Sequence, residues 1–244
     1  MNAIKTILRR ELLGYFSTPV AWVFLVIFLV LTNAITFVVG NYYERGIADM
    51  QPFFVYHPWL YLFLVPAIAM RLWAEERKSG TIEFLLTLPV TASQAVIGKF
   101  LAAWLFLGLA LALTVPLWIT VNVLGDPDNG SIFTAYVGSW LMAGAYLSIG
   151  SCLSSLTRNQ VVAFILAVVT CLVLLLIGLT PVAGFFRILL PQAFVDGIVS
   201  LSMLTHFDAI SKGVLDLRDL LYYFLMIGFW LCANLIVVEL RKAD

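Results

Sequence analysis

Charged residues are scarce in this sequence. Only 11% of its 244 residues are Asp, Glu, Lys or Arg, whereas 62% are hydrophobic. In ordinary soluble domains about a quarter of the residues are charged. Polar atoms must form a large part of any surface that faces water. The composition therefore excludes a soluble globular protein and indicates one with lipid as its solvent. Basic and acidic residues balance at 14 each, so net charge predicts no nucleic-acid partner.

Cysteine and histidine are also scarce. Cys152, Cys171 and Cys232 all fall in apolar runs, and we interpret them as small packing residues instead of a disulfide or metal set. No Cys/His spacing of a zinc site occurs, so we expect no metal. His57 and His206 are far apart in the sequence. We interpret each as forming an interfacial hydrogen bond, with a shared proton site as the alternative.

Uncharged stretches divide the chain into spans. Six stretches of 19 residues or more contain no charged residue: 12–43, 50–70, 100–125, 129–157, 159–186 and 220–238. A helix needs about 20 residues to cross a hydrocarbon core of ~30 Å, and the stretches are apolar on every face, which argues against strands. We predict an all-α polytopic membrane protein, a single transmembrane domain over 1–244. Its six helices are expected near 19–40, 54–73, 100–124, 133–156, 160–180 and 219–238, with kinks at Pro66 and Pro116.

The distribution of lysine and arginine predicts the orientation. If the N-terminus is cytoplasmic, ten of these residues lie on the cytoplasmic side and four on the other. The positive-inside rule then favours both termini in the cytoplasm.

Three segments are not spans. Residues 1–17 read as an amphipathic interfacial helix, with a solvated lead-in as the alternative. Residues 74–98 are expected to form a short cytoplasmic helix instead of a plain charged loop, with Ser93 capping the helix that follows. Residues 181–218 contain two apolar stretches, separated at Pro191, that are each too short to cross the membrane alone. They predict a pair of short re-entrant helices on the outer side, or a surface loop with amphipathic patches.

The cytoplasmic segment also resembles a known family. The run EERKSGTIEFLLTLPVT begins with the charged residues Glu75, Glu76, Arg77 and Lys78, then turns apolar up to Pro89. It is similar to the cytoplasmic signature of type-2 ABC exporter permeases. The run 204–223, LTHFDAISKGVLDLRDLLYY, looks like the branch related to gliding-motility and copper-maturation permeases.

The resemblance implies a function and partners. The family's permease pairs with a second permease, as a homodimer or heterodimer, and with two copies of a separate ABC ATPase that holds ATP and magnesium. An accessory protein on the periplasmic side would be a further partner, and a bacterial inner membrane the location. The positions that match the family's coupling helix, which sits in a groove of the ATPase, are Glu75, Glu76, Arg77, Gly80, Thr81, Glu83, Leu86 and Pro89. Lys78 belongs to the same charged start, where paired contacts with the ATPase are expected.

This chain is expected to be non-catalytic. It contains no G-x-x-x-x-G-K-[ST] phosphate-binding loop, and no buried carboxylates cluster with its histidines. We expect no cofactor on the chain, and the sequence assigns no substrate-binding residue. Within the fourth span Gly144, Ser148 and Cys152 share one face, which predicts close helix packing, with a substrate surface as the alternative.

Two other functions stay open at this point. A mechanotransmitting or scaffold subunit that moves no solute would have a similar sequence. A secondary transporter would call for charged residues in mid-span or for a repeated half, and the chain has neither.

Overall fold

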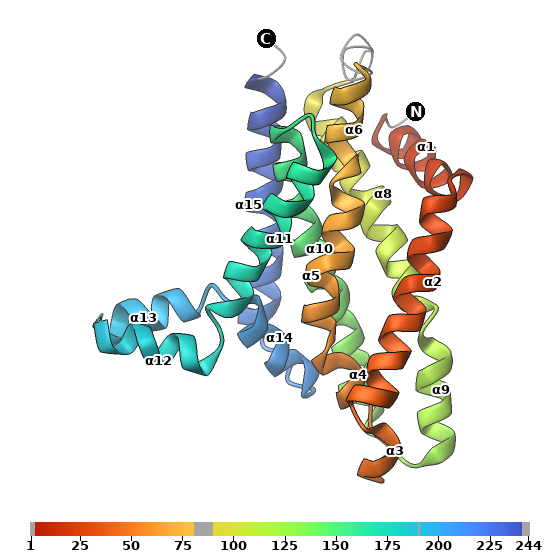
Figure 1. Cartoon of the computed structure of the whole chain (residues 1–244), viewed down its shortest axis with the longest axis vertical. Helices are drawn as coiled ribbons and strands as arrows, with labels where there is room; N and C mark the ends of the chain where they lie inside the picture. The colour runs from red at the N-terminus through yellow and green to blue at the C-terminus, as the bar shows by residue number, and fades with distance from the viewer. Residues whose placement is uncertain (1–2, 81–89, 190, 241–244) are drawn as a thin grey trace.

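The structure is a computed structural model that describes residues 3–80, 90–189 and 191–240. The helices follow in chain order as α1 (Ala3–Ser17), α2 (Pro19–Ala34), the π-helix η1 (Ile35–Val39), α3 (Tyr42–Arg45), α4 (Gln51–Val55), α5 (His57–Ala69), α6 (Arg71–Ser79), α8 (Ala92–Ala112), α9 (Val115–Leu124), α10 (Asn129–Leu156), α11 (Gln160–Leu176), α12 (Thr180–Leu189), α13 (Gln192–Val199), α14 (Met203–Ser211) and α15 (Leu217–Leu240). No strand occurs in the described ranges (Figure 1). The predicted all-α polytopic class is confirmed.

The number of spans depends on how bent helices are counted. Four segments are long and apolar enough to cross a membrane alone: α2 with η1, α8 with α9, α10, and α15. The number rises to six if the bent pairs α11–α12 and α13–α14 each form one span. The expected second span, 54–73, is not one of these segments, because it is divided among the shorter helices α4, α5 and α6. Only Met70 separates α5 from α6, and its backbone angles stay helical at φ −58° and ψ −26°.

The two prolines inside spans differ in their effect. Helix α5 runs through Pro66 without interruption. By contrast, α8 ends at Ala112, two residues separate it from the start of α9 at Val115, and Pro116 follows in the first turn of α9. The hydroxyl of Thr114 donates to the Leu111 carbonyl over 2.6 Å at this break, where a proline leaves backbone groups without their helical partners.

Three short helices, not two, fill the expected outer segment. Helices α12 and α13 form a hairpin that projects sideways from the bundle, and α14 lies back in the bundle against α10 (Figure 1). Arg187 and Asp196 pair across this hairpin at 3.7 Å. The additional break arises at Ser202, whose hydroxyl accepts from the Leu204 N–H and so caps α14.

Helix α10 is the centre of the bundle. Other parts of the chain bury 78% of the most apolar stretch of α10, against 28% of that of α2 with η1 and 22% of that of α15. It contacts α5, α6, α8, α11, α14 and α15. Small side chains permit this, because backbones approach closely where no bulk intervenes. Ser148 and Cys152 are both buried on α10.

A pair of tryptophans holds α8 against α10. The indole N–H of Trp104 donates to the Trp140 carbonyl over 2.9 Å, and Trp140 donates back to the Trp104 carbonyl over 3.2 Å. The rings stack with centroids 4.3 Å apart. A Cβ atom on Gly144 would lie 2.8 Å from the Trp104 indole nitrogen, and one on Gly108 equally near that of Trp140. Glycine is therefore required beneath each indole.

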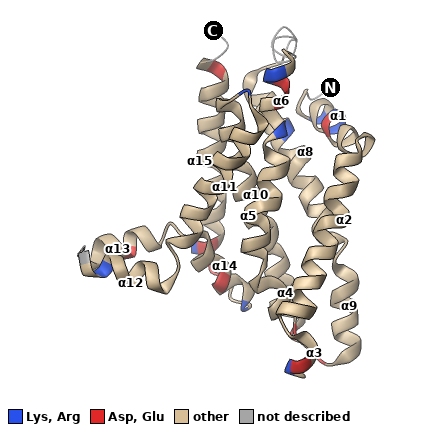
Figure 2. Cartoon of the chain, viewed as in Figure 1, with Lys and Arg blue, Asp and Glu red and all other residues tan. Residues whose placement is uncertain are grey.

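Both termini lie at one end of the molecule, beside the start of α8 and the end of α6 (Figure 1). Charged residues lie mainly at this end and at the opposite end, while the middle of the bundle carries almost none (Figure 2). We call the first the termini end. Such a distribution suits a slab of lipid around the uncharged middle.

We predict that Gly144→Val destabilises the bundle by about 1–3 kcal/mol, because its side chain must displace the Trp104 indole from the Trp140 carbonyl. The free energy of unfolding in mixed micelles measures this. Gly228→Val on α15 is the matched control, since nothing lies within 4 Å of a Cβ there. Equal stability of the two variants would contradict the packing described here.

Candidate functional site

Helix α6 carries the first half of the segment expected to contact an ATPase. It places Glu75, Glu76, Arg77 and Lys78 at the termini end. Gly80 follows the helix with φ +72° and ψ 4°, the left-handed conformation that ends helices and that glycine adopts without steric cost. The remaining predicted positions, Thr81, Glu83, Leu86 and Pro89, lie outside the described residues.

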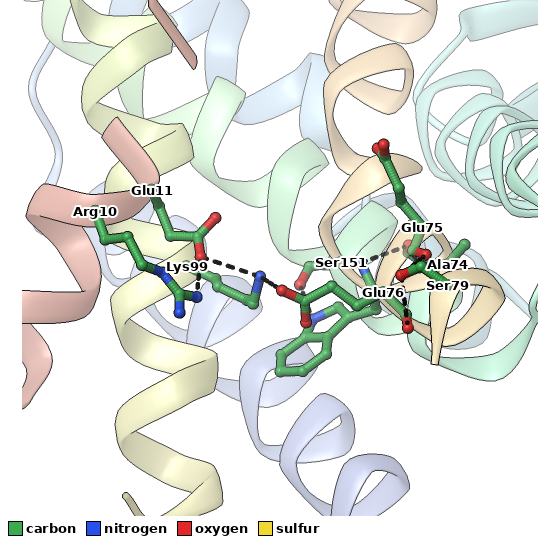
Figure 3. A network of polar contacts seen from close by, with 10 residues as sticks. Arg10, Glu11, Ala74, Glu75, Glu76, Ser79, Lys99 and Ser151 are labelled. Atoms are coloured by element: carbon green, nitrogen blue, oxygen red, sulfur yellow. Dashed lines mark hydrogen bonds and ion pairs between the residues drawn. The ribbon is translucent and has the colours of Figure 1, made fainter. Parts of the chain in front are cut away.

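A buried lysine joins three helices at this end. The Lys99 ammonium on α8 donates to Glu76 on α6 over 2.6 Å and to Glu11 on α1 over 3.4 Å. Arg10 donates to the same carboxylate of Glu11 over 2.6 Å (Figure 3). The side chain of Lys99 is only 3% exposed, and its ammonium lies 5.4 Å from the centre of the Trp73 ring. We call these five residues the Lys99 cluster.

Apolar contacts reinforce the ionic ones between α1 and α8. A Cβ atom on Gly98 would lie 2.8 Å from a methyl carbon of Ile7, so α1 rests directly on the α8 backbone. Tyr15 stacks on Phe106 with ring centroids 5.1 Å apart. Helix α1 is therefore packed against the bundle. Its amphipathic sequence pattern predicts only that it lies at the membrane interface.

Serine side chains of α10 hold the junction of α5 and α6. The Ser154 hydroxyl donates to the Met70 carbonyl over 2.8 Å and accepts from the N–H groups of Trp73 and Ala74 at 3.2 and 3.0 Å. One side chain thus satisfies backbone groups on both sides of the junction. This fixes the direction in which α6 leaves the bundle.

A second set of hydrogen bonds crosses the bundle beside those of Ser154. The Trp73 indole donates to the Ser151 hydroxyl over 3.1 Å, and the Asn234 amide of α15 donates to the same hydroxyl over 2.7 Å. All three side chains are fully buried. Hydrogen bonds between apolar helices stabilise a defined arrangement, so α6, α10 and α15 are joined at the level of Trp73.

The cluster perturbs one carboxylate outside the spans. Burial opposes the charge of Glu11, but Lys99 and Arg10 outweigh it, so the pKa of Glu11 lies below its ordinary value of 4.5. The Glu11 carboxylate is thus held in its charged form. Such a group contributes stability above its ordinary pKa and loses that contribution as the pH falls through the lower folded value.

Sequence reasoning missed the roles of Lys99 and Glu11. Lys99 counted only as a cytoplasmic positive charge, because 23 residues separate it from Glu76 and 88 from Glu11. The only available signal was its place directly before a long apolar run, where an ammonium needs a partner. Capping was also assigned to the wrong residue: Thr91, not Ser93, accepts from the Gln94 N–H and forms a capping box.

The two histidines have separate surroundings. His57 is fully buried, with ring centroids 4.4 Å from Phe53 and 5.2 Å from Tyr61, and neither of its nitrogens has a hydrogen-bond partner among the described residues. The interpretation of His57 as an interfacial hydrogen-bonding residue is wrong. His206 does form such bonds, with the Asp219 carboxylate at 2.5 Å and the Ser200 carbonyl at 2.9 Å.

Taken together, the fold and this site define a polytopic helical membrane protein whose polar contacts converge where α6 leaves the bundle. The model of the ABC-2 family transporter proteins matches residues 6–226. The chain therefore belongs to the ABC-2 transporter family.

Two curated relatives carry names of the same kind. The "Probable multidrug ABC transporter permease YbhS" of Escherichia coli (strain K12) is 34% identical over 87 residues, which are 36% of this chain and 22% of that protein. The "Inner membrane transport permease YhhJ" of the same strain is 29% identical over 142 residues, 57% of this chain and 36% of that protein. The matched part of the chain thus spans well under half the length of either relative.

We predict that Lys99→Met lowers the free energy of unfolding by about 3 kcal/mol, because two largely buried carboxylates lose their shared cation. Chemical unfolding in mixed micelles measures the loss. Lys212→Met is the control, since Lys212 pairs with Asp208 in an exposed contact worth at most about 1 kcal/mol. The exchange Lys99→Glu with Glu76→Lys should recover part of the stability, and a Lys99→Met variant as stable as the control would contradict the cluster.

We further predict a pH dependence that resides in Glu11. Above pH 4.5 the parent should be more stable than Glu11→Gln, since the charged carboxylate pairs with Lys99 and Arg10. As the pH falls below that value the difference should shrink, because folding then requires a proton to be kept off Glu11. Unfolding free energies of both proteins between neutral and acidic pH test this. A difference that stays constant on acidification would assign the effect to packing alone.

Proposed function

We propose that this chain is the membrane-spanning permease subunit of an ABC exporter, driven by ATP hydrolysis in a separate ATPase subunit. Family membership supports the transporter role, and the permease names of the relatives agree with it. The observation that carries the coupling role is the set of polar contacts that joins α6 to α1, α8, α10 and α15 directly before residues 81–89.

The mechanism follows from the rigidity of that junction. ATP bound between two ATPase subunits would draw them together, and the segment from Glu75 to Pro89 would transmit the movement into the bundle. Because α6 is tied to α8 by Lys99 and to α10 by Ser154, a displacement of the segment would move packed helices as one body. Two such subunits would alternate between inward-open and outward-open states.

The partners and location belong to the same proposal. Two ATPase copies would hold ATP and magnesium, and a second permease would complete the pathway, with an accessory periplasmic protein as a further candidate. Both ends of the described chain lie at one end of the molecule (Figure 1), which supports the placement of both in the cytoplasm of a bacterium. The inner membrane would then surround the uncharged middle of the bundle.

We predict that Glu76→Ala and Gly80→Pro each leave the chain in the membrane but lower ATPase stimulation by roughly fivefold or more. The first removes the anchor on Lys99; the second cannot adopt the left-handed backbone at residue 80. Copurification of the ATPase and its ATP hydrolysis rate, with and without this chain, are the measurements.

Gly80→Asn is the matched control, because asparagine tolerates left-handed angles and should keep the stimulation. Parent-like stimulation in both variants would contradict the coupling role. Failure of any ATP-binding protein encoded beside this chain to copurify with the parent would contradict the ABC transporter subunit itself.

A further inference from the structure

A cavity of about 650 Å³ lies at the termini end between α1, α2, α5, α6 and α8. Its volume falls within the range of small-molecule sites, roughly 300–1,000 Å³. Its lining includes Glu11, Glu76 and Lys99, whose ion pairs join α6 to α1 and α8.

The cavity has two chemically distinct parts. One part is lined by side chains of both charges, and the other by aliphatic and aromatic groups. The charged part consists of Arg10, Glu11, Arg71, Glu75, Glu76 and Lys99. The apolar part includes Phe24, Ile27, Leu64, Ala67, Ile68 and Phe106. A ligand that fills it must be amphipathic.

The apolar part opens towards lipid. Val20, Val23 and Ile27 on α2 line the cavity yet remain 51%, 54% and 42% exposed. They belong to a segment apolar enough to span the membrane. The charged part lies among the charged residues at the termini end (Figure 2). The cavity is thus placed to take a headgroup at the membrane surface and an acyl chain from the adjoining leaflet.

The charges select the headgroup. Three cations and three carboxylates line the charged part, so a purely anionic head gains no net attraction. Arg71 and Glu75 pair at 2.8 Å and keep 32% and 47% of their side chains exposed, while Arg10 is 53% exposed. These groups can therefore turn to a phosphate and an ammonium without leaving a buried charge unpaired.

We propose that this cavity binds one zwitterionic aminophospholipid from the leaflet at the termini end. The guanidinium groups of Arg10 and Arg71 receive its phosphate, and Glu75 receives its ammonium. One acyl chain lies against α2 and α5, and the other stays in the bilayer. The site shares Glu75 and Glu76 with the proposed coupling segment but requires no bound ATPase, so lipid binding and coupling are measured separately.

The test is photolabelling of the full-length chain in nanodiscs made of equal amounts of phosphatidylethanolamine and phosphatidylglycerol. A trace of one or the other lipid carries a photoactivatable acyl chain, and the labelled peptides are mapped. The expected result is several-fold stronger labelling of α2 and α5 by phosphatidylethanolamine. Equal or stronger labelling by phosphatidylglycerol would overturn the proposed headgroup selectivity.

Filling the cavity should abolish the labelling. Ala67→Trp is expected to reduce it roughly tenfold, equivalent to about 1.4 kcal/mol of binding free energy. Ile27→Trp enters from the half-exposed α2 side and serves where Ala67→Trp fails to fold. Val169→Trp, on the exposed face of α11, is the matched control and should label like the parent. Parent-like labelling of the folded cavity variants would overturn the site.

Two further outcomes separate this proposal from others. If the cavity variants keep the parent's labelling but lose dimers on size exclusion, the cavity belongs to a contact with a second copy and the lipid site is overturned. ATPase copurification is measured on the same samples. Loss of labelling in the variants with copurification intact supports a lipid site that is independent of the ATPase.

Discussion

The buried ammonium of Lys99 is the interaction on which the termini end of this protein depends. A single cation, 3% exposed, neutralises carboxylates from two other helices. An unpaired charge in such a place costs several kcal/mol, so the three helices must stay together for the fold to persist. The packing of Ile7 on Gly98 and of Tyr15 on Phe106 provides the apolar share of the same contact.

This constraint gives the coupling segment a defined attachment. Glu76, which the family resemblance assigns to the contact with an ATPase, also directs its carboxylate to Lys99 inside the chain. Glu75 is paired with Arg71 and is 47% exposed, so it remains accessible to a partner. Serine hydroxyls on α10 fix the helix junction from the other side. Adjacent residues of one charged run therefore have different surroundings: Glu76 lies in a largely buried ion pair and Glu75 in a half-exposed one.

Much of the fold was predictable because it follows from local composition. Charge gaps locate the apolar helices, and Pro116 and Pro191 mark real breaks. The cluster was not predictable, because Lys99, Glu76 and Glu11 are brought together only by tertiary packing. The third short helix after residue 180 was missed as well, since Ser202 gives only a weak capping signal. The fully buried His57 shows the same limit: aromatic neighbours from α2 and α4 surround it.

The most direct measurement is a pair of spin-label distances in the complex with the ATPase, with and without ATP. In the first pair, a label on Leu13, an exposed position of α1, is measured against a label on Val161 of α11. In the second pair, a label on Lys78 of α6 is measured against the same position, Val161. The account predicts that ATP changes both distances in the parent. In Lys99→Met the α6 distance should still change while the α1 distance does not. An α1 distance that changes equally in Lys99→Met would contradict the role of the buried lysine.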